Sequence, residues 1–524
     1  MRRFPLFSFV SFSVVTGLAA ALSGCDDAAS DGTGSSSSGS SMSSSGTGGG
    51  GGSTPSCAPS AGKAIEASCG VFVQTGAAGD GSRAAPFGSI KAAVAGLGDA
   101  KAIYVCGSES YTGSLTVPSG VSIIGGLSCN DWVFDEKHAK PEIVGDPNIP
   151  AVLVDGSGSA AFESIRIRAV DATTPSASSI ALLVHGATLS IAHSELAAGA
   201  GAAGLDGTDA PDTNTATGKL GSQGGIGCAA QQTSKGGPET EQICDGAVAS
   251  IGGKGGDGTF GNGMDGAAGQ TGAAGQGGKG EVFSGWSCAV GGANGGGANG
   301  ATGTFGAVGA GGVAKGMLTQ AGFTPARGGD GGLGLAGQGG GGGGASKGSF
   351  SNCGGMPGMA GPGGAGGGGG TGGCGGKAGT GGGGGGASFA IAVIDGHVSL
   401  VATKATSATG GAGGDGGSGQ PGAPGGLGGY GGSAIIMPPG CNGGNGGSGG
   451  NGGGGGGGRG GHSAPVVYMG NAPTIDAQTT LTKGSSGAHG VGQGNGADPA
   501  EDGADGSACA VLDFTGATEA CSKN

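Results

Sequence analysis

The sequence predicts an all-β chain that coils into a parallel β-helix, a solenoid into which long glycine-rich segments are inserted. Two observations favour this fold class. Runs of β-branched and apolar residues recur as a strand, a turn dipeptide and a second strand. A glycine-rich block directly follows three of these units. Because every block begins at the same place in its unit, we interpret the blocks as insertions at one corner of a stacked repeat, in which each rung contacts only its neighbours.

Three repeat units precede a block. Their expected strands cover residues 180–184 and 187–191, 389–394 and 397–401, and 465–469 and 472–476. The blocks after them begin at Gly199, Gly410 and Gly484.

A fourth unit has expected strands at 151–154 and 165–168, and only a short loop, 171–178, where the others have a block. Alternation along its second strand predicts that Ile165 and Ile167 point inward, and that Arg166 and Arg168 point outward. An antiparallel β-sandwich is the alternative fold. It explains the strands, but it does not explain why insertions recur at one position.

An amphipathic helix and three strands are expected before these units. Within residues 85–97, four apolar side chains fall on one helical face, those of Phe87, Ile90, Val94 and Leu97. Short β-branched runs follow at 102–106, 114–117 and 121–124.

Five motifs between residues 70 and 130 resemble the start of right-handed parallel β-helices of the pectin-lyase-like type. They are a glycine-rich turn, a Pro-Phe-x-Ser-Ile helix, an Ile-Tyr-Val strand, a Tyr-to-Leu turn and a Gly-Val-Ser-Ile-x-Gly segment, at residues 76–81, 86–90, 103–105, 111–115 and 120–125. The resemblance implies a right-handed coil. It also implies that the helix caps the N-terminal end of the coil, since repeat stacks need capping elements.

Glycine supplies 144 of the 524 residues and proline 21. Ordering glycine costs more backbone entropy than ordering any other residue, so the apolar core is expected in residues 65–195, 387–403 and 464–482. Glycine occupies every third position from Gly263 to Gly278, a period that suits polyglycine-II or collagen-like helices. Packed threads of that kind and disordered loops are the two alternatives for the blocks. In composition the blocks resemble glycine-rich, PGRS-like surface proteins of bacteria.

The N-terminus predicts export. Residues 1–3 are positively charged, and residues 4–21 form an apolar run that is typical of a signal peptide. Leu22-Ser-Gly-Cys25 resembles the lipobox of bacterial lipoproteins, which implies cleavage before Cys25 and its lipidation. An ordinary secretory signal with a chance cysteine, or a membrane-spanning anchor, is the alternative.

We expect a membrane-anchored lipoprotein of the outer membrane or cell surface. Asp26 and Asp27 resemble the inner-membrane retention signal of enteric bacteria, a rule that does not transfer to all bacteria, so the choice of membrane stays open.

These features predict nine segments along the chain. They are a signal peptide (1–24), a lipidated cysteine with a Ser/Gly tether (25–56), an N-terminal β-helix with its capping helix (57–198), a glycine-rich insertion (199–386), a β-helix rung (387–409), a second insertion (410–463), a second rung (464–483), a glycine-rich loop (484–507) and a C-terminal strand with a disulfide cap (508–524).

Thirteen cysteines leave an even number for disulfides if Cys25 is lipidated, which fits an oxidising compartment. Sequence cannot fix the connectivity, but local pairs are the simplest expectation. They are Cys57–Cys69, Cys106–Cys129, Cys228–Cys244, Cys353–Cys374 and Cys509–Cys521, with Cys288–Cys441 as a long-range pair.

Charge and motif content exclude several functions. The formal net charge is −13, and no basic run follows Arg2-Arg3, so nucleic-acid binding is not expected. No metal or cofactor is expected either: the chain has no Cys-x-x-Cys pair and no phosphate-binding loop. Residues 252–260 partly resemble a calcium-binding nonapeptide, but the motif is not repeated in tandem.

Catalysis on a β-helix requires clustered carboxylates beside a basic residue. The candidates on the expected strands are Arg166, Arg168, His193 and Glu195. Outward charges on a solvated sheet are the alternative interpretation. The sequence therefore predicts a structural or adhesive envelope protein that contacts glycans, matrix or cell-surface proteins. A polysaccharide lyase or glycoside hydrolase on the same scaffold is the second hypothesis.

Overall fold

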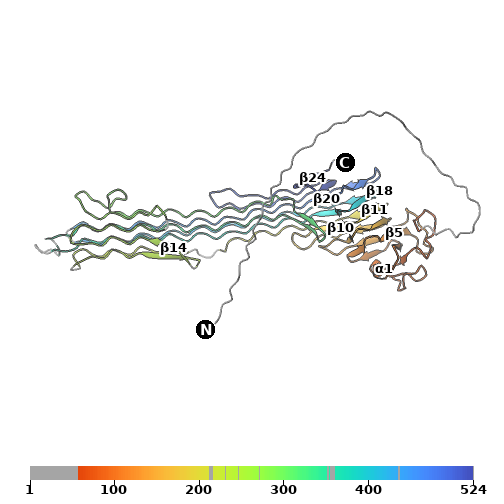
Figure 1. The fold of residues 1–524 in the computed structure, drawn as a ribbon, viewed down its shortest axis with the longest axis horizontal. Helices are drawn as coiled ribbons and strands as arrows, with labels where there is room; N and C mark the ends of the chain where they lie inside the picture. Colours follow the sequence, from red (N-terminus) through yellow and green to blue (C-terminus); the bar gives the residue numbers. More distant parts are fainter. Residues whose placement is uncertain are drawn as a thin grey trace, which may run out of the picture. The chain divides into compact units, whose positions relative to one another are not determined.

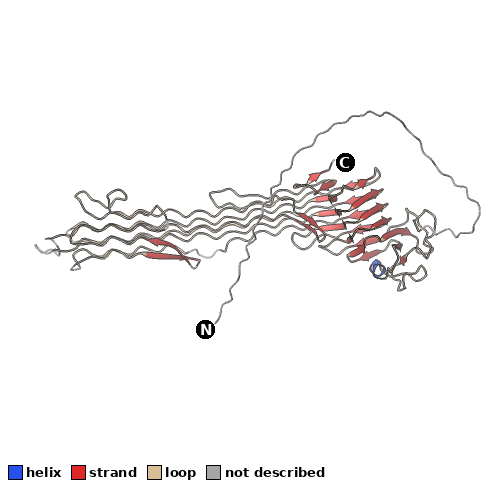
Figure 2. Cartoon of the chain, viewed as in Figure 1, coloured by secondary structure: helices blue, strands red, loops and turns tan. Residues whose placement is uncertain are grey.

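The structure is a computed structural model that describes residues 57–522, except 212–215, 230–231, 246, 271, 351–352, 354–359 and 435–436. The predicted signal peptide, Cys25 and the tether therefore lie outside the described residues. The described residues belong to one compact unit, Pro55–Asn524. Strands dominate its regular structure, and α1 (Ile90–Ala95) is the one α-helix among the described residues (Figure 2). The prediction of an all-β chain with parallel strands is confirmed.

Three parallel sheets organise the strands (Figure 1). The first contains β1 (Val71–Val73), β2 (Ala102–Cys106), β5 (Ser122–Leu127), β8 (Ser159–Glu163), β11 (Thr188–Ala192), β18 (His397–Val401) and β21 (Thr474–Ile475). The second contains β4 (Leu115–Pro118), β7 (Val152–Asp155), β10 (Ser179–His185), β17 (Ser388–Ile394), β20 (Ser463–Met469) and β23 (Val511–Asp513), with β24 (Ala520–Cys521) antiparallel at its edge. The third contains β3 (Ser110–Thr112), β6 (Glu142–Val144), β9 (Arg166–Arg168), β12 (Glu195–Ala197), β19 (Lys404–Thr406) and β22 (Thr480–Thr482).

The chain enters the sheets in a fixed order. From β7 onward it passes through the second sheet, then the first, then the third, and returns to the second at β10, β17 and β20. Equivalent residues therefore stack: Leu182 pairs with Val152 on one side and with Ile391 on the other. One core of buried side chains from all three sheets runs along the stack. Ile165 and Ile167 are buried in it, whereas the Arg166 and Arg168 side chains are 43% and 45% exposed, as alternation predicts.

The repeat unit is larger than predicted, because each pass has a third strand. Residues 165–168 were assigned to a second strand, but β9 belongs to the third sheet. The second strand of that pass is β8, Ser159–Glu163, whose small residues gave no β-branched signal. Every strand of the third sheet has only three residues, which is too short for an alternating pattern to be recognised.

The helix is shorter than the predicted 85–97. The backbone of Phe87 forms hydrogen bonds with Phe72 and Gln74 instead, as an extra strand pairing would. Ser89 then caps the helix by accepting a hydrogen bond from the Ala92 N–H. Ile90 and Ala93 are buried against the core beside β1 and β2.

The glycine-rich blocks all leave the sheets at the same corner. They follow β12, β19 and β22, the successive strands of the third sheet, and precede β17, β20 and β23 of the second. We call their extended segments threads; they comprise residues 199–228 (of which 212–215 lie outside the described residues), 295–313, 328–348, 360–386, 410–434, 437–462, 484–493 and 501–507. The threads run side by side (Figure 1). Two hairpins interrupt the first block, β13 (Thr240–Cys244) with β14 (Ala247–Gly252), and β15 (Met317–Thr319) with β16 (Gly322–Thr324).

Backbone hydrogen bonds join the threads at every third residue. The amides of Gly370, Gly373 and Gly376 donate to the carbonyls of Gly444, Gly447 and Gly450 at 3.0, 3.0 and 2.9 Å. Thread 437–462 bonds in this way to six other segments, at 295–312, 328–344, 360–386, 410–434, 484–493 and 501–507. The threads therefore pair backbone groups of the blocks with one another, and these bonds offset part of the entropic cost of ordering glycine.

Side chains replace missing neighbours at the edges of the threads. Thread 484–493 does not extend along the whole of thread 410–434. Beyond its end, the backbone N–H groups of Gly422, Gly428 and Gly431 donate to the side-chain oxygens of Asn451, Asn445 and Asn442 at 3.1, 2.9 and 2.9 Å. Asn and Asp side chains are short enough to reach a backbone group on the adjoining segment. These side chains thus close parts of the surface that another thread would otherwise cover.

Hairpin β15–β16 lies on the outer face of the second sheet. Leu318 and Phe323 of the hairpin pack against Ile180, Leu183 and Phe389 of β10 and β17. This second apolar cluster explains why β10, β17 and β20 are buried on both faces, as continuous apolar strands require.

Six disulfides link twelve cysteines. Cys57–Cys69, Cys106–Cys129, Cys288–Cys441 and Cys509–Cys521 are the pairs that the sequence analysis expected. The pairs Cys228–Cys244 and Cys353–Cys374 are wrong: Cys228 bonds to Cys353, and Cys244 bonds to Cys374. The physical reason is that threads return alongside one another, so a cysteine more than 100 residues away becomes its neighbour.

Candidate functional site

The outward charges of the third sheet form a ladder. Glu142, Arg166, Glu195 and Lys404 occupy equivalent positions on the adjoining strands β6, β9, β12 and β19. Arg166 donates to one Glu195 oxygen from Nε at 3.1 Å and from Nη2 at 3.0 Å. Lys140 donates to the other Glu195 oxygen at 3.1 Å. The carboxylate of Glu195 is thus shared between two cations.

Arg168 and His193 have carboxylate partners of their own. Arg168 donates to Glu142 at 3.3 Å. The His193 ring lies between two carboxylates, with Nδ1 2.7 Å from Glu163 and Nε2 3.4 Å from Glu136. The structure therefore brings Arg166 and Glu195 together, and places Arg168 and His193 in separate pairs.

The turn that carries His193 is regular along the stack. His193 has a φ of 45°, and the equivalent residues before β9 and β19, Ser164 and Ala402, have φ values of 51° and 45°. Left-handed backbone is uncommon outside glycine. Here it recurs in three successive passes, so it belongs to the repeat and does not single out His193 as a strained catalytic group.

The ladder fixes the charge state of Glu195. Partial burial raises the pKa of this carboxyl, but the hydrogen bonds and charges of Lys140 and Arg166 outweigh that effect and hold the pKa below its usual range. A general acid at neutral pH needs the opposite shift, because it must keep its proton. Glu195 is therefore suited to ion pairing and not to proton donation.

Lys140, Glu142 and Glu136 were not predicted as partners of the candidate residues, and the contact between Glu163 and His193 was not predicted either. Only the stacking register brings them into contact: Glu142 and Glu195 flank Arg166 on the two adjoining strands. Had the third strand of each pass been recognised, a search for opposite charges one repeat apart would have found the contact between Arg168 and Glu142.

The calcium-like segment 252–260 has no site for a cation. Asp257 contacts Lys235 at 3.3 Å and Lys254 at 3.1 Å, and its other role is to accept the Gly236 N–H at 2.8 Å. Burial raises the pKa of Asp257, but the hydrogen bond from Gly236 and the two lysines outweigh this effect and lower the pKa below its usual value. The carboxylate is therefore already paired with lysines. Among the described residues, no group of three or more His, Cys, Asp or Glu side chains is arranged to hold a metal ion.

A cavity of about 210 Å³ lies beside α1. Its walls include Ser89, Lys91, Ser110 and Thr112 together with core residues such as Ile90. No Asp, Glu, His or Cys lines it. It therefore lacks the carboxylate pair that glycoside cleavage requires.

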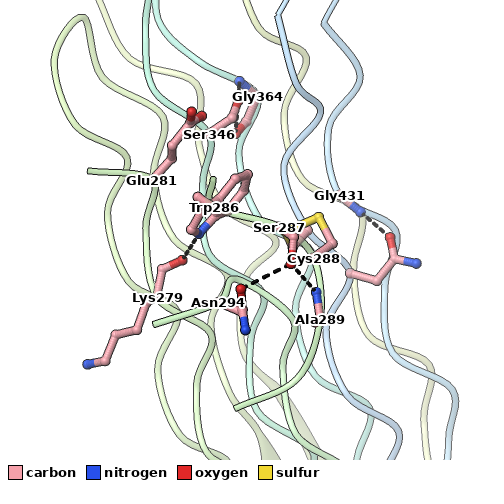
Figure 3. The surroundings of a disulfide bond; sticks show 12 residues. Lys279, Glu281, Trp286, Ser287, Cys288, Ala289, Asn294, Ser346, Gly364 and Gly431 are labelled. Atoms are coloured by element: carbon pink, nitrogen blue, oxygen red, sulfur yellow. Dashed lines mark hydrogen bonds between the residues drawn. A yellow bond between two sulfur atoms is a disulfide. The ribbon is translucent and has the colours of Figure 1, made fainter. Parts of the chain in front are cut away.

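One loop of the first block differs from the threads around it. Residues 282–296 contain no charged residue, and they carry Phe283 and Trp286 in a chain with 4% aromatic residues. Cys288 ties the loop to Cys441 of thread 437–462 (Figure 3). The Trp286 indole donates to the Lys279 carbonyl at 2.8 Å, and Ser287 donates to Asn294 at 3.0 Å (Figure 3). The loop is thus held by an internal hydrogen bond, by a hydrogen bond to Lys279 and by a disulfide to a neighbouring thread.

The outer side chains of this loop are apolar and accessible. Val282, Phe283 and Val290 are 53%, 45% and 62% exposed. The polar side chains of Ser287 and Asn294 are already bonded within the loop. The loop can therefore offer an ordered apolar contact to another molecule. The loop was not among the sites predicted from the sequence, although two aromatic residues and a cysteine in a glycine-rich block were available as a signal.

Comparisons of the chain with known protein families, with curated proteins and with solved structures found no match.

Proposed function

We propose that this protein is a lipid-anchored component of the cell envelope with a structural or adhesive role, in which a β-helix supports a bundle of glycine threads. The parallel strands and the fixed order in which the chain enters three sheets support a β-helix. The three-residue spacing of thread hydrogen bonds, with six neighbours around one thread, supports a polyglycine-II arrangement, which has three residues per turn.

The observation that carries the adhesive role is the disulfide-anchored loop 282–296, an ordered and uncharged apolar surface on a chain of net charge −13. Contiguous exposed apolar patches mark interaction sites, and in this proposal Val282, Phe283 and Val290 form one such patch. Proposed partners are glycans, matrix components or cell-surface proteins. The charged candidates Arg166, Arg168, His193 and Glu195 act as ladder and turn contacts in this proposal.

Export is supported by the disulfides, which fit an oxidising environment. Among the described residues, no helix is long and apolar enough to cross a membrane. The lipobox-like Cys25 supplies the proposed anchor, and two or more acyl chains hold a protein stably on a membrane.

Two experiments test the proposal. Cys25→Ser should move the protein from the membrane to the soluble fraction, and continued membrane partitioning would contradict the lipoprotein assignment. For adhesion, cells displaying the full chain should attach to glycan-coated or matrix-coated surfaces better than cells that lack it. The double variant Phe283→Ser/Val290→Ser should lose this attachment, whereas Leu333→Ser, which changes an exposed apolar residue on a thread, should retain it.

The enzymatic alternative has a direct test. The purified chain is incubated with acidic polysaccharides, with and without Ca²⁺, and unsaturated or hydrolysed products are sought. Product formation that Glu195→Gln abolishes would overturn the non-enzymatic proposal.

A further inference from the structure

A buried histidine connects the glycine threads to the sheets. His462 ends thread 437–462, directly before β20, and is 0% exposed. Its Nδ1 lies 3.0 Å from the backbone nitrogen of Ser507, which can only donate, so Nδ1 is an unprotonated acceptor. Its Nε2 lies 2.9 Å from the carbonyl of Lys315 and must carry the proton. These two partners are compatible only with the neutral ring.

Aromatic rings and cations surround this histidine. Phe323 and Phe514 contact it edge to face, each with ring centroids 5.4 Å away. Arg459 is 8% exposed at its side chain and pairs with Glu519, which also accepts from Ser507. The Lys315 ammonium lies 5.2 Å from the centre of the Phe514 ring and donates to the carbonyls of Phe514 and Gly516.

The charged groups around the ring are thus two cations and one carboxylate. Arg459 and Glu519 act on His462 electrostatically, while the ammonium of Lys315 is also near Asp513 of β23. Burial raises the pKa of Asp513, but hydrogen bonds from Thr515 and Tyr468 and the charge of Lys315 lower it below its usual value. A further positive charge on His462 would therefore meet a carboxylate that is already paired.

His462 holds two segments in place. The Lys315 carbonyl accepts the Nε2 proton of His462, and Lys315 lies in the segment just before hairpin β15–β16. Arg459 holds the same segment by donating to the Val313 carbonyl at 2.7 Å. Ser507 leads into the C-terminal strand β23. Beyond these contacts, the hairpin is held by the packing of Leu318 and Phe323 and by a hydrogen bond from Gln320 to Asp155 at 2.6 Å.

We propose that His462 is an acid-sensitive latch, and that its protonation releases hairpin β15–β16 from the outer face of the second sheet. A proton on Nδ1 would point the new Nδ1–H at the backbone N–H of Ser507, so that two donors face each other. It would also add a third positive charge beside those of Arg459 and Lys315. Moving the hairpin away removes the Lys315 cation and the Phe323 ring and admits water to the imidazole. It also frees Nε2 from the Lys315 carbonyl, so that the ring can turn its new Nδ1–H away from Ser507. The release exposes the apolar side chains of Ile180, Leu183 and Phe389, so acidification converts a covered sheet face into an accessible one.

The sign of the pH dependence follows from burial. Burial is the largest effect and lowers the pKa of His462 from its ordinary 6.5. The hydrogen bond to the Lys315 carbonyl and the charge of Glu519 raise the pKa, whereas the charge of Arg459 lowers it, and the net shift is downward. The released state therefore binds the proton more tightly than the latched state. The latched state loses stability as the pH falls below 6.5. Burial raises the pKa of Glu519, but its hydrogen bonds and the nearby cations hold it low, so protonation of Glu519 at lower pH acts in the same direction.

Hydrogen exchange of the full chain tests the latch. Exchange is followed by mass spectrometry at pH 7.5 and pH 5.5, and is corrected for intrinsic rates with an unstructured reference peptide. For peptides that cover residues 313–324, opening should increase roughly tenfold at the lower pH. Peptides from β10 and β17 should lose far less protection. Loss of protection across all three sheets at once would show general acid unfolding and overturn the proposal.

A neutral substitute separates charge from packing. In His462→Gln, the side-chain oxygen can accept from Ser507 and the nitrogen can donate to Lys315 at every pH. Its hairpin should show no pH-dependent opening. His397→Gln, which changes an exposed histidine at the start of β18, should behave like the wild type. Equal pH dependence in His462→Gln and the wild type would refute the latch.

Discussion

Arg166 directs both Nε and Nη2 at a single oxygen of Glu195, at 3.1 and 3.0 Å, across the neighbouring strands β9 and β12. This contact joins two of the residues that the sequence offered as catalytic candidates. Lys140 occupies the other oxygen of Glu195. The same outward position that suggested a catalytic surface is used to stack the repeat.

Glu195→Gln is expected to weaken the stack modestly. It leaves Lys140 and Arg166 without a counter-charge, but because these side chains are partly exposed, the free energy of unfolding should fall by only about 0.5–1 kcal/mol. The pKa of Glu195 is lowered in the folded state, so its contribution is present above the unfolded-state pKa and is lost as the pH falls through the folded value. Thermal denaturation at low and high salt measures the effect, and a loss that is independent of salt would contradict ion pairing.

Alanine at Gly366 is expected to disrupt the threads. A Cβ there would lie 1.8 Å from the carbonyl oxygen of Gly343 and 2.4 Å from its carbon. The backbone of Gly343 cannot move aside as a flexible side chain can, so the substitution should lower the free energy of unfolding by about 2 kcal/mol or more. Gly261→Ala, in the same block, has nothing within 4 Å of its Cβ and should change stability by less than about 1 kcal/mol. Paired melting curves compare them, and equal midpoints would argue against close thread packing.

Peptide mapping under non-reducing conditions tests the connectivity of the first block. The structure predicts fragments that join Cys228 to Cys353 and Cys244 to Cys374. Mass spectrometry should find no fragment that joins Cys228 to Cys244. Finding that local pair would mean that thread 199–228 and the segment around Cys353 are not neighbours.

Phe323→Ala should expose the outer face of the second sheet. Phe323 is 8% exposed and contacts the rings of Phe389, His462 and Phe514. Removing a buried aromatic ring typically costs about 3–5 kcal/mol, and binding of an apolar dye should increase. Phe283→Ala removes an aromatic ring that is 45% exposed and serves as the matched control. Similar dye binding by both variants would show that the hairpin does not cover the sheet.

Local pattern was sufficient for the long strands. Residues 389–394 are a continuous apolar run, and apolar and polar residues alternate over 397–401; the structure forms β17 and β18 at these positions. The inward position of Ile167 and the outward position of Arg168 also followed from a period of two. Arg166 and Glu195 were recognised as outward charges, but their pairing was not, because it depends on which strands stack.

The sequence by itself determined the positions of the longer strands, the single insertion corner and the all-β class, because each depends on residues close together in the chain. The tertiary structure decided the third sheet, the partners of Cys228 and Cys244, and the packing of the threads. The two disulfides and several thread contacts join segments more than 100 residues apart, and each strand of the third sheet stacks on a strand from a neighbouring pass of the chain. Glycine carries no side chain that could mark a neighbour, so only the backbone hydrogen bonds between threads reveal which segments lie together.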